Sequence, residues 1–232
     1  MKHLTVIQHT SAEYLGLMED HFEGRGIRFD YFRPFTTAGR LPDRNGIGDA
    51  LVLLGGGPWG SVGDRPVPTL AEEIKLARTC LMLEKPVIGI GLGAQILSLA
   101  ADGCATPSPL TFEVGHASAV RSDALNGFLP GRFPHIIYMR DRPEPPAYAK
   151  TLALDEQGRP AVFQIGKNAL GFAGHPGFKL AIAEDLIMEF EDTPPESGAR
   201  FTALSRLKTE IEDALVPIMT GLIQVTGLME AK

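Results

Sequence analysis

The chain has 232 residues, a formal net charge of -6 and 44% hydrophobic residues, enough to bury one core, so we expect a single domain over residues 1–232. The acidic balance and an aromatic content of only 7% argue against a nucleic-acid partner. No apolar run approaches the roughly 20 residues that cross a bilayer, and the first residues lack the pattern of a signal peptide. We therefore expect a soluble cytoplasmic protein with no membrane partner.

The first half of the chain alternates strand-like and helix-like patterns. Short apolar runs predict strands at 4–8, 27–32, 50–54 and 87–90. Helical spacing follows Thr10 or Ser11, which offer an N-cap, and recurs at 68–83 and 94–101. This alternation predicts an α/β fold with a mostly parallel central sheet and helices on both faces, a flavodoxin-like three-layer sandwich.

The second half changes to short strand-like pieces, which predict a small antiparallel part. Residues 142–146 read as a surface loop, 181–191 as a helix, and 193–232 as a C-terminal helical extension that Pro217 kinks or splits. The strand-like pieces are 112–120, 135–139, 151–155, 161–165 and 169–173.

The residues around Gly91 predict a strand-to-helix elbow at the carboxyl edge of the sheet. An apolar strand ends in the alternating glycines Gly89, Gly91 and Gly93, and an apolar helix follows. In a hydrolytic elbow, the residue at the tip is a Ser or Cys nucleophile. Here the residue at the tip is Gly91. Gly89 and Gly93 already allow the backbone to turn, so the turn does not by itself require a glycine at position 91.

Neither cysteine is a candidate to replace that nucleophile. Cys80 belongs to the helix before the elbow, and Cys104 lies at least one helix length, roughly 15 Å, beyond its tip. Their isolation predicts reduced thiols. No His, Cys and Asp cluster has the spacing of metal ligands, and we expect neither a metal nor another cofactor.

Four segments together resemble the class I glutamine amidotransferase family, specifically the free-standing type related to the glutaminase domain of GMP synthetase. They occur in the family's order and span most of the chain, from about residue 4 to 191. The segments read Leu-Leu-Gly-Gly-Gly-Pro at 53–58, Lys-Pro-Val-Ile-Gly-Ile-Gly-Leu-Gly-Ala-Gln at 85–95, Glu-Val-Gly at 113–115 and Gly-Phe-Ala-Gly-His-Pro at 171–176.

The resemblance implies a reaction in which a Cys thiolate attacks the side-chain amide of glutamine, activated by a His that a Glu orients. The sequence departs from that pattern at the nucleophile, which is Gly91, and at the orienting carboxylate, where His175-Pro176 is followed by Gly177. A third departure is Tyr-Met-Arg-Asp at 138–141, where near relatives have Trp-His-Gly-Asp. Two losses within one triad suggest an evolved loss of the reaction.

The resemblance also places the residues of a ligand pocket. The backbone amides of Gly57 and Leu92 would be the oxyanion donors, with Gly56 beside them. Gln95 would either brace the elbow or touch a ligand, and Glu113 is the carboxylate placed near the pocket. His175 would be a vestigial base, a ligand contact or a structural residue.

These features leave three hypotheses open. The first is a protein without glutaminase activity that binds glutamine or a related small molecule, or regulates a synthase-type partner or a second copy of itself. The second is an enzyme of different hydrolytic chemistry in the same crevice, using His175 as a general base. The third is a glutamine amidotransferase, hydrolysing glutamine and transferring ammonia, whose nucleophile has been mutated.

Overall fold

One nine-stranded sheet runs through the protein in the order β2-β1-β3-β4-β11-β10-β9-β6-β7. A computed structural model describes residues 1–229, so the last three residues of the predicted extension lie outside the described part. Five neighbouring strands are parallel: β2 (Arg28–Phe32), β1 (His3–Ile7), β3 (Ala50–Leu53), β4 (Val87–Ile90) and β11 (Ala169–Phe172). The sheet continues through antiparallel pairs to β10 (Pro160–Ile165), β9 (Lys150–Asp155), β6 (Thr111–Ala119) and β7 (Arg132–Met139).

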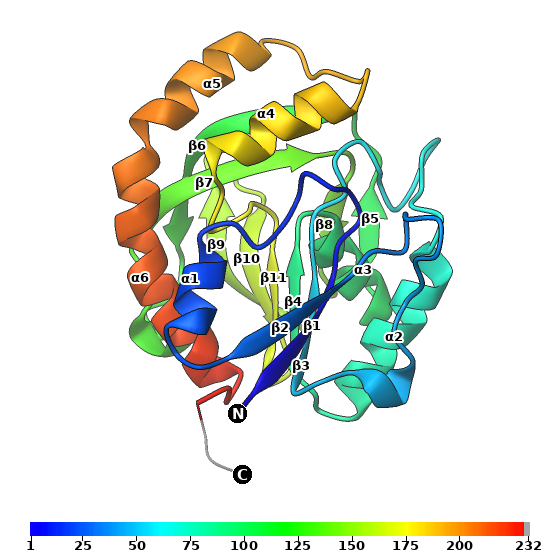
Figure 1. Ribbon diagram of the computed structural model, residues 1–232. Coiled ribbons are helices and arrows are strands. Elements are labelled where there is room, and N and C mark those ends of the chain that lie inside the picture. The colour runs from blue at the N-terminus through cyan, green and yellow to red at the C-terminus, as the bar shows by residue number, and fades with distance from the viewer. Residues whose placement is uncertain (230–232) are drawn as a thin grey trace.

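The strands of the parallel half are buried because both faces of the sheet are covered. Every residue of β3 and β4 is buried, as expected for strands that read as continuous apolar runs. Helices α2 (Leu70–Met82) and α3 (Leu92–Ala100) pack on one face, and α1 (Met18–Glu23) and α6 (Lys208–Val225) on the other (Figure 1). The predicted α/β class is thus confirmed.

The remaining helices cover the antiparallel end of the sheet. Helices α4 (Leu180–Glu189) and α5 (Ser197–Arg206) cross β6 and β7 (Figure 1). Their contact is an apolar cluster that includes Phe112, Ile136, Ile182 and Leu204. Two short 3-10 helices, η1 (Arg44–Gly46) and η2 (Ala124–Gly127), complete the helical elements of the described chain. No helix within residues 1–229 has both the length and the apolar character needed to cross a bilayer.

The helix expected after Thr10 is wrong in its start. Helix α1 begins only at Met18, and residues 10–17 are irregular. The Thr10 hydroxyl oxygen does accept the Glu13 N–H at 3.1 Å, but Gly16 then adopts a φ of 63°. A left-handed residue interrupts a right-handed helix, so the turn is not propagated.

Two further expectations change in the second half. The segment expected as a loop contains a strand, β8 (Arg142–Glu144), which pairs antiparallel with β5 (Cys104–Thr106). The C-terminal helical segment divides at Leu207, whose N–H bonds the Leu204 carbonyl at 3.0 Å, whereas Pro217 lies inside α6. Pro removes one backbone donor from a helix, yet α6 is continuous through Pro217, so the expected split at that residue is wrong.

Candidate functional site

The elbow is present at the junction of β4 and α3. Gly91 has φ 57° and ψ -114°, lies directly between the two elements, and donates its N–H to the Phe172 carbonyl at 2.9 Å. Gly93 is required by close approach, since a Cβ there would lie 2.0 Å from the Leu53 carbonyl oxygen. A Cβ at Gly91 would contact only the Gly55 Cα, at 3.3 Å. A side chain at position 91 would therefore point toward the glycine loop after β3.

The glycine loop packs against the first residue of the elbow helix. Gly56 faces Leu92 so closely that an added Cβ would lie 2.4 Å from the Leu92 Cδ2, and Gly57 has a φ of 54°. Gly55, Gly56, Gly57 and Gly91 are all buried. The structure thus brings together the predicted oxyanion loop and the predicted elbow, and it closes both from solvent.

The carboxylate of Glu13 is hydrogen-bonded to the backbone N–H of Gly57, the predicted oxyanion donor. The Gly57 N–H donates to Glu13 Oε2, and the other carboxylate oxygen lies against Gly55. Burial raises the pKa of Glu13 to about 7, against the opposing effects of the Gly57 hydrogen bond and of the nearby His9. The sequence pattern places Glu13 at the start of a helix, and no local signal marks it as a partner of the glycine loop.

A buried ion pair lies behind Glu13. His9 contacts Glu73 on α2 at 2.7 Å through Nε2 and the Gly55 carbonyl at 3.1 Å through Nδ1. Since both partners are acceptors, both ring nitrogens carry a proton and His9 is cationic. Burial opposes that charge, but Glu73, the Gly55 hydrogen bond and Glu13 outweigh burial and raise the pKa of His9. Neither His9 nor Glu73 belongs to a motif that the sequence marks as functional.

His175 follows β11 and is fully engaged by the backbone. Its Nε2 lies 2.8 Å from the Tyr14 carbonyl oxygen, and its Nδ1 accepts the Gly177 N–H at 3.1 Å. A carbonyl can only accept and an amide can only donate, so the proton is on Nε2 and the ring is neutral. Burial lowers the pKa of His175 to about 4, although the Tyr14 hydrogen bond acts in the opposite direction.

Residues 14–18 fill the space beside the predicted orienting position. The Leu17 N–H donates to the Gly177 carbonyl at 2.9 Å. A Cβ at Gly177 would lie 2.8 Å from the Met18 Cγ and 3.0 Å from its backbone nitrogen. An acidic side chain at position 177 would therefore require the start of α1 to move.

Gln95 braces the elbow helix against the loop that covers it. Its carbonyl oxygen accepts from the Ser61 hydroxyl at 2.5 Å, and its amide donates to the Arg140 carbonyl at 2.8 Å. Asp141 accepts the N–H groups of Ser61 and Val62, each at 3.0 Å. Of the two roles predicted for Gln95, these contacts support bracing.

The loop is held at its rim by charged groups. Arg140 donates to the Pro58 carbonyl at 2.8 Å, and its guanidinium and that of Arg65 contact the same Asp192 carboxylate. Arg65 also lies over the Trp59 ring, 5.0 Å from its centroid. These contacts tie the loop after β3 to the end of β7 and to the segment that follows α4.

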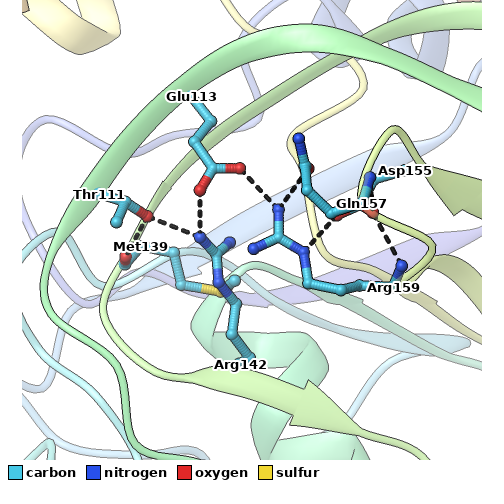
Figure 2. A network of polar contacts seen from close by, with 7 residues as sticks. All are labelled: Thr111, Glu113, Met139, Arg142, Asp155, Gln157 and Arg159. Atoms are coloured by element: carbon cyan, nitrogen blue, oxygen red, sulfur yellow. Dashed lines mark hydrogen bonds and ion pairs between the residues drawn. The ribbon is translucent and has the colours of Figure 1, made fainter.

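Glu113 lies in a separate polar network on β6. One carboxylate oxygen accepts from Arg142 at 2.6 Å and the other from Arg159 at 2.8 Å (Figure 2). The resemblance placed Glu113 near the elbow pocket, whereas the structure uses its carboxylate to join β8 to the β9–β10 hairpin. Its contacts are therefore with two arginines and not with the elbow.

Gly91 carries no side chain, and His175 has no free ring nitrogen. Burial raises the pKa of the Cys80 thiol on α2 to about 11, and Cys104 is exposed on β5. Among residues 1–229, no group of three or more His, Cys, Asp and Glu side chains is arranged to hold a metal ion.

Parallels to known proteins come from solved structures, since no family model and no curated protein sequence matches the chain. A glutamine amidotransferase from Thermotoga maritima superposes with a TM-score of 0.81 at 23% identity, over 97% of this chain and 98% of that one. One from Methylobacillus flagellatus gives 0.78 at 19% identity, over 97% and 95% of the two chains.

A protein from Thermoplasma acidophilum that is described as part of a GMP synthase gives a TM-score of 0.56 at 16% identity, over 90% of this chain and 98% of that one. The likeness thus extends over nearly the whole length of each of these structures. At these identities it concerns the fold. The chain has the fold of the glutamine amidotransferases.

Proposed function

We propose that this protein is a glutamine amidotransferase-like protein that does not hydrolyse glutamine and acts by binding or regulation. The observation that carries the proposal is the tip of the elbow. The backbone turn at Gly91 is the one that presents a nucleophile in this kind of elbow, and the residue there has no side chain. Removing a catalytic nucleophile typically costs several orders of magnitude in rate.

The contacts of His175 and of the Gly57 N–H also support the proposal. His175 would have to accept a proton to activate a nucleophile, but its Nδ1 lone pair accepts the Gly177 N–H and its Nε2 faces the Tyr14 carbonyl. The Gly57 N–H would have to stabilise an oxyanion, but it donates to Glu13. A thiol restored at position 91 would thus meet neither a free base nor a free donor at Gly57.

The same contacts count against a different hydrolytic reaction that uses His175 as general base. A general base must reach the proton that it removes. His175 is buried, and both of its ring nitrogens are held by backbone groups of residues 14 and 177. The third hypothesis, a glutaminase altered at one position, meets the difficulty that Met18 occupies the space beside Gly177.

The fold likeness supports the choice of partner. A protein described as part of a GMP synthase has the same fold. We propose a synthase-type enzyme as the partner, with a second copy of this chain as the alternative. Glutamine or a related small molecule is the ligand that the resemblance implies for the elbow. In this structure the Gly57 N–H donates to Glu13 instead.

Release of ammonia from glutamine tests the proposal directly. Purified wild-type protein and the His175→Ala variant should both give the rate of a protein-free blank. A wild-type rate above the blank that His175→Ala abolishes would overturn the proposal, because it would show a working site that uses this imidazole.

The Gly91→Cys variant tests the role of the surroundings. We expect the thiol alone to restore no turnover, because His175 and the Gly57 amide are already engaged. Reaction with a thiol reagent in denaturant shows that the cysteine is present, and circular dichroism shows that the variant is folded. Recovery of glutaminase activity would mean that only the missing thiol silences the site.

A further inference from the structure

A cavity lies on the antiparallel side of the sheet, away from the elbow. It opens where β6 and the β9–β10 hairpin part, since β6 pairs with β9 at residues 117–119. Its volume is about 300 Å³. The polar side chains that line it include Glu113, His135, Asp155, Arg159 and Arg200, and no residue of the elbow or of its glycine loop is among its lining residues.

Two of the three carboxylates that line this cavity are already hydrogen-bonded within the protein. Glu113 accepts from Arg142 and Arg159, and Asp155 accepts from the side chain of Arg159 at 2.6 Å and from two backbone N–H groups of the hairpin (Figure 2). Glu156, at the cavity's exposed side, lies 3.9 Å from Arg132. The Glu113 and Asp155 carboxylates thus have internal partners, whereas the Glu156 carboxylate is open to solvent.

Two side-chain nitrogens at the same place have no such partner. Within residues 1–229, the Nε of Arg200 and the Nε2 of His135 are buried without a hydrogen-bond partner, and both residues line the cavity. His135 is only 7% exposed and lines the cavity, and burial lowers its pKa to about 4, so the ring is neutral. Buried polar groups are normally hydrogen-bonded, so the unpartnered nitrogens of Arg200 and His135 at one cavity call for an explanation.

The two guanidinium groups on Glu113 are held in place by the protein alone. Arg142 is fixed by Glu113 and by the Thr111 hydroxyl at 2.8 Å, and Arg159 by Glu113, Asp155 and Gln157 (Figure 2). Of the two, Arg159 lines the cavity, and a side chain fixed in this way loses little further freedom when a ligand binds, which favours affinity. Arg200 reaches the site from α5, where it contacts Glu196 at 3.4 Å.

We propose that this cavity is a binding site for a compact oxyanion, a carboxylate or phosphate group of a small molecule. Such a group brings several acceptor oxygens, which matches the Arg200 Nε–H and the His135 ring in the tautomer that carries its proton on Nε2. Planar guanidinium groups recognise carboxylate and phosphate oxygens in particular. The volume is at the lower limit of ligand cavities, so a ligand of a few heavy atoms fits.

Titration of the whole protein with single anions tests the proposal and separates the two chemistries. Inorganic phosphate, acetate and succinate are added at constant ionic strength, with chloride as the reference, while the His135 ring resonance is followed by NMR and heat by calorimetry. We expect saturable binding of phosphate, of a carboxylate or of both, with a shift of the His135 signal. Saturable binding of phosphate alone, or of the carboxylates alone, identifies which of the two groups the site recognises. No saturable binding up to about 10 mM, a very weak affinity, would overturn the proposal.

Substitutions of two lining residues, Arg200 and His135, locate the bound anion. Arg200→Ala should weaken the bound anion by about tenfold, the usual effect of losing one charge-assisted hydrogen bond. Arg206→Ala is the matched control, because Arg206 is an exposed arginine of the same helix and does not line the cavity. His135→Gln, checked for folding by circular dichroism, should also weaken binding. Binding that neither Arg200→Ala nor His135→Gln changes would place the anion elsewhere and overturn the assignment.

Discussion

The carboxylate of Glu13 is a hydrogen-bond acceptor for the backbone N–H of Gly57, in the loop that faces the elbow tip at Gly91. A backbone donor in this position could serve a developing oxyanion. Here an internal carboxylate takes that place, supported by the buried His9–Glu73 pair. In the protein as we propose it, glutaminase activity is lost at the elbow, and the Glu13 side chain accepts the hydrogen bond that the Gly57 N–H would otherwise give to a ligand.

Glu13→Gln should change how stability depends on pH. The folded-state pKa of Glu13 is raised from 4.5 to about 7 by burial, so folding favours the protonated acid. Its contribution is full below pH 4.5 and is lost as the pH rises through about 7, an effect on the order of 3 kcal/mol. The variant should therefore gain stability relative to the wild type between about pH 5 and 8.

Urea unfolding of both proteins across that range measures the difference. Glu23→Gln is the control, since Glu23 is an exposed acid at the end of α1, and its difference from the wild type should stay flat. A Glu13→Gln difference that is also flat, or that grows toward acid pH, would show that the Glu13 carboxyl is not held in a raised-pKa environment.

Gly177→Ala should destabilise the protein although only one methyl group is added. The new Cβ would lie 2.8 Å from the Met18 Cγ and 3.0 Å from the Met18 nitrogen, which is backbone and cannot move alone. Overpacking of this kind costs about 1–3 kcal/mol. Gly198→Ala is the opposite case, because Gly198 lies in α5 with no atom within 4 Å of an added Cβ, and it should leave stability unchanged or raise it by up to about 1 kcal/mol.

Denaturant unfolding of the two variants under one condition gives the comparison. Equal free energies of unfolding for Gly177→Ala and Gly198→Ala would mean that the start of α1 moves away from residue 177 at little energetic cost. In that event, the space for an orienting carboxylate at position 177 would not be closed by Met18.

The histidine rings should show different protonation states at about pH 6. His175 should be neutral with its proton on Nε2, because Nδ1 accepts the Gly177 N–H and burial lowers its pKa to about 4. His9 should carry protons on both nitrogens, because it faces Glu73 and the Gly55 carbonyl. Nitrogen-15 spectra of the rings distinguish these forms. A His175 ring that titrates near its ordinary pKa of about 6.5 would show that it is solvated and available as a base.

The strand positions could be predicted because their signals are local. The runs that became β3, β4 and β11 are continuous and apolar, and glycines mark where they end. The elbow was predicted for the same reason, since the backbone turn at Gly91 and the close packing at Gly93 depend on residues next to each other in the chain.

The groups that close the site could not be predicted because their partners are distant in sequence. Glu13 and Gly57 are 44 residues apart, and His9 and Glu73 are 64 apart. The apolar spacing of Leu15, Met18 and Phe22 predicted a helix, yet a buried irregular segment satisfies the same spacing up to Met18. Local periodicity therefore does not distinguish a helix from a chain segment laid across a sheet edge.

Glu73→Ala should be the most destabilising of these substitutions. It would leave the His9 imidazolium buried without its carboxylate, and breaking one side of a buried ion pair costs about 3–5 kcal/mol. Glu72→Ala, on the exposed face of the same helix, should stay within about 0.5 kcal/mol of the wild type. Thermal unfolding of both measures the contrast. If the double variant His9→Leu/Glu73→Leu regains stability over Glu73→Ala, the cost comes from the unpaired charge. A Glu73→Ala protein as stable as Glu72→Ala would contradict a charged His9.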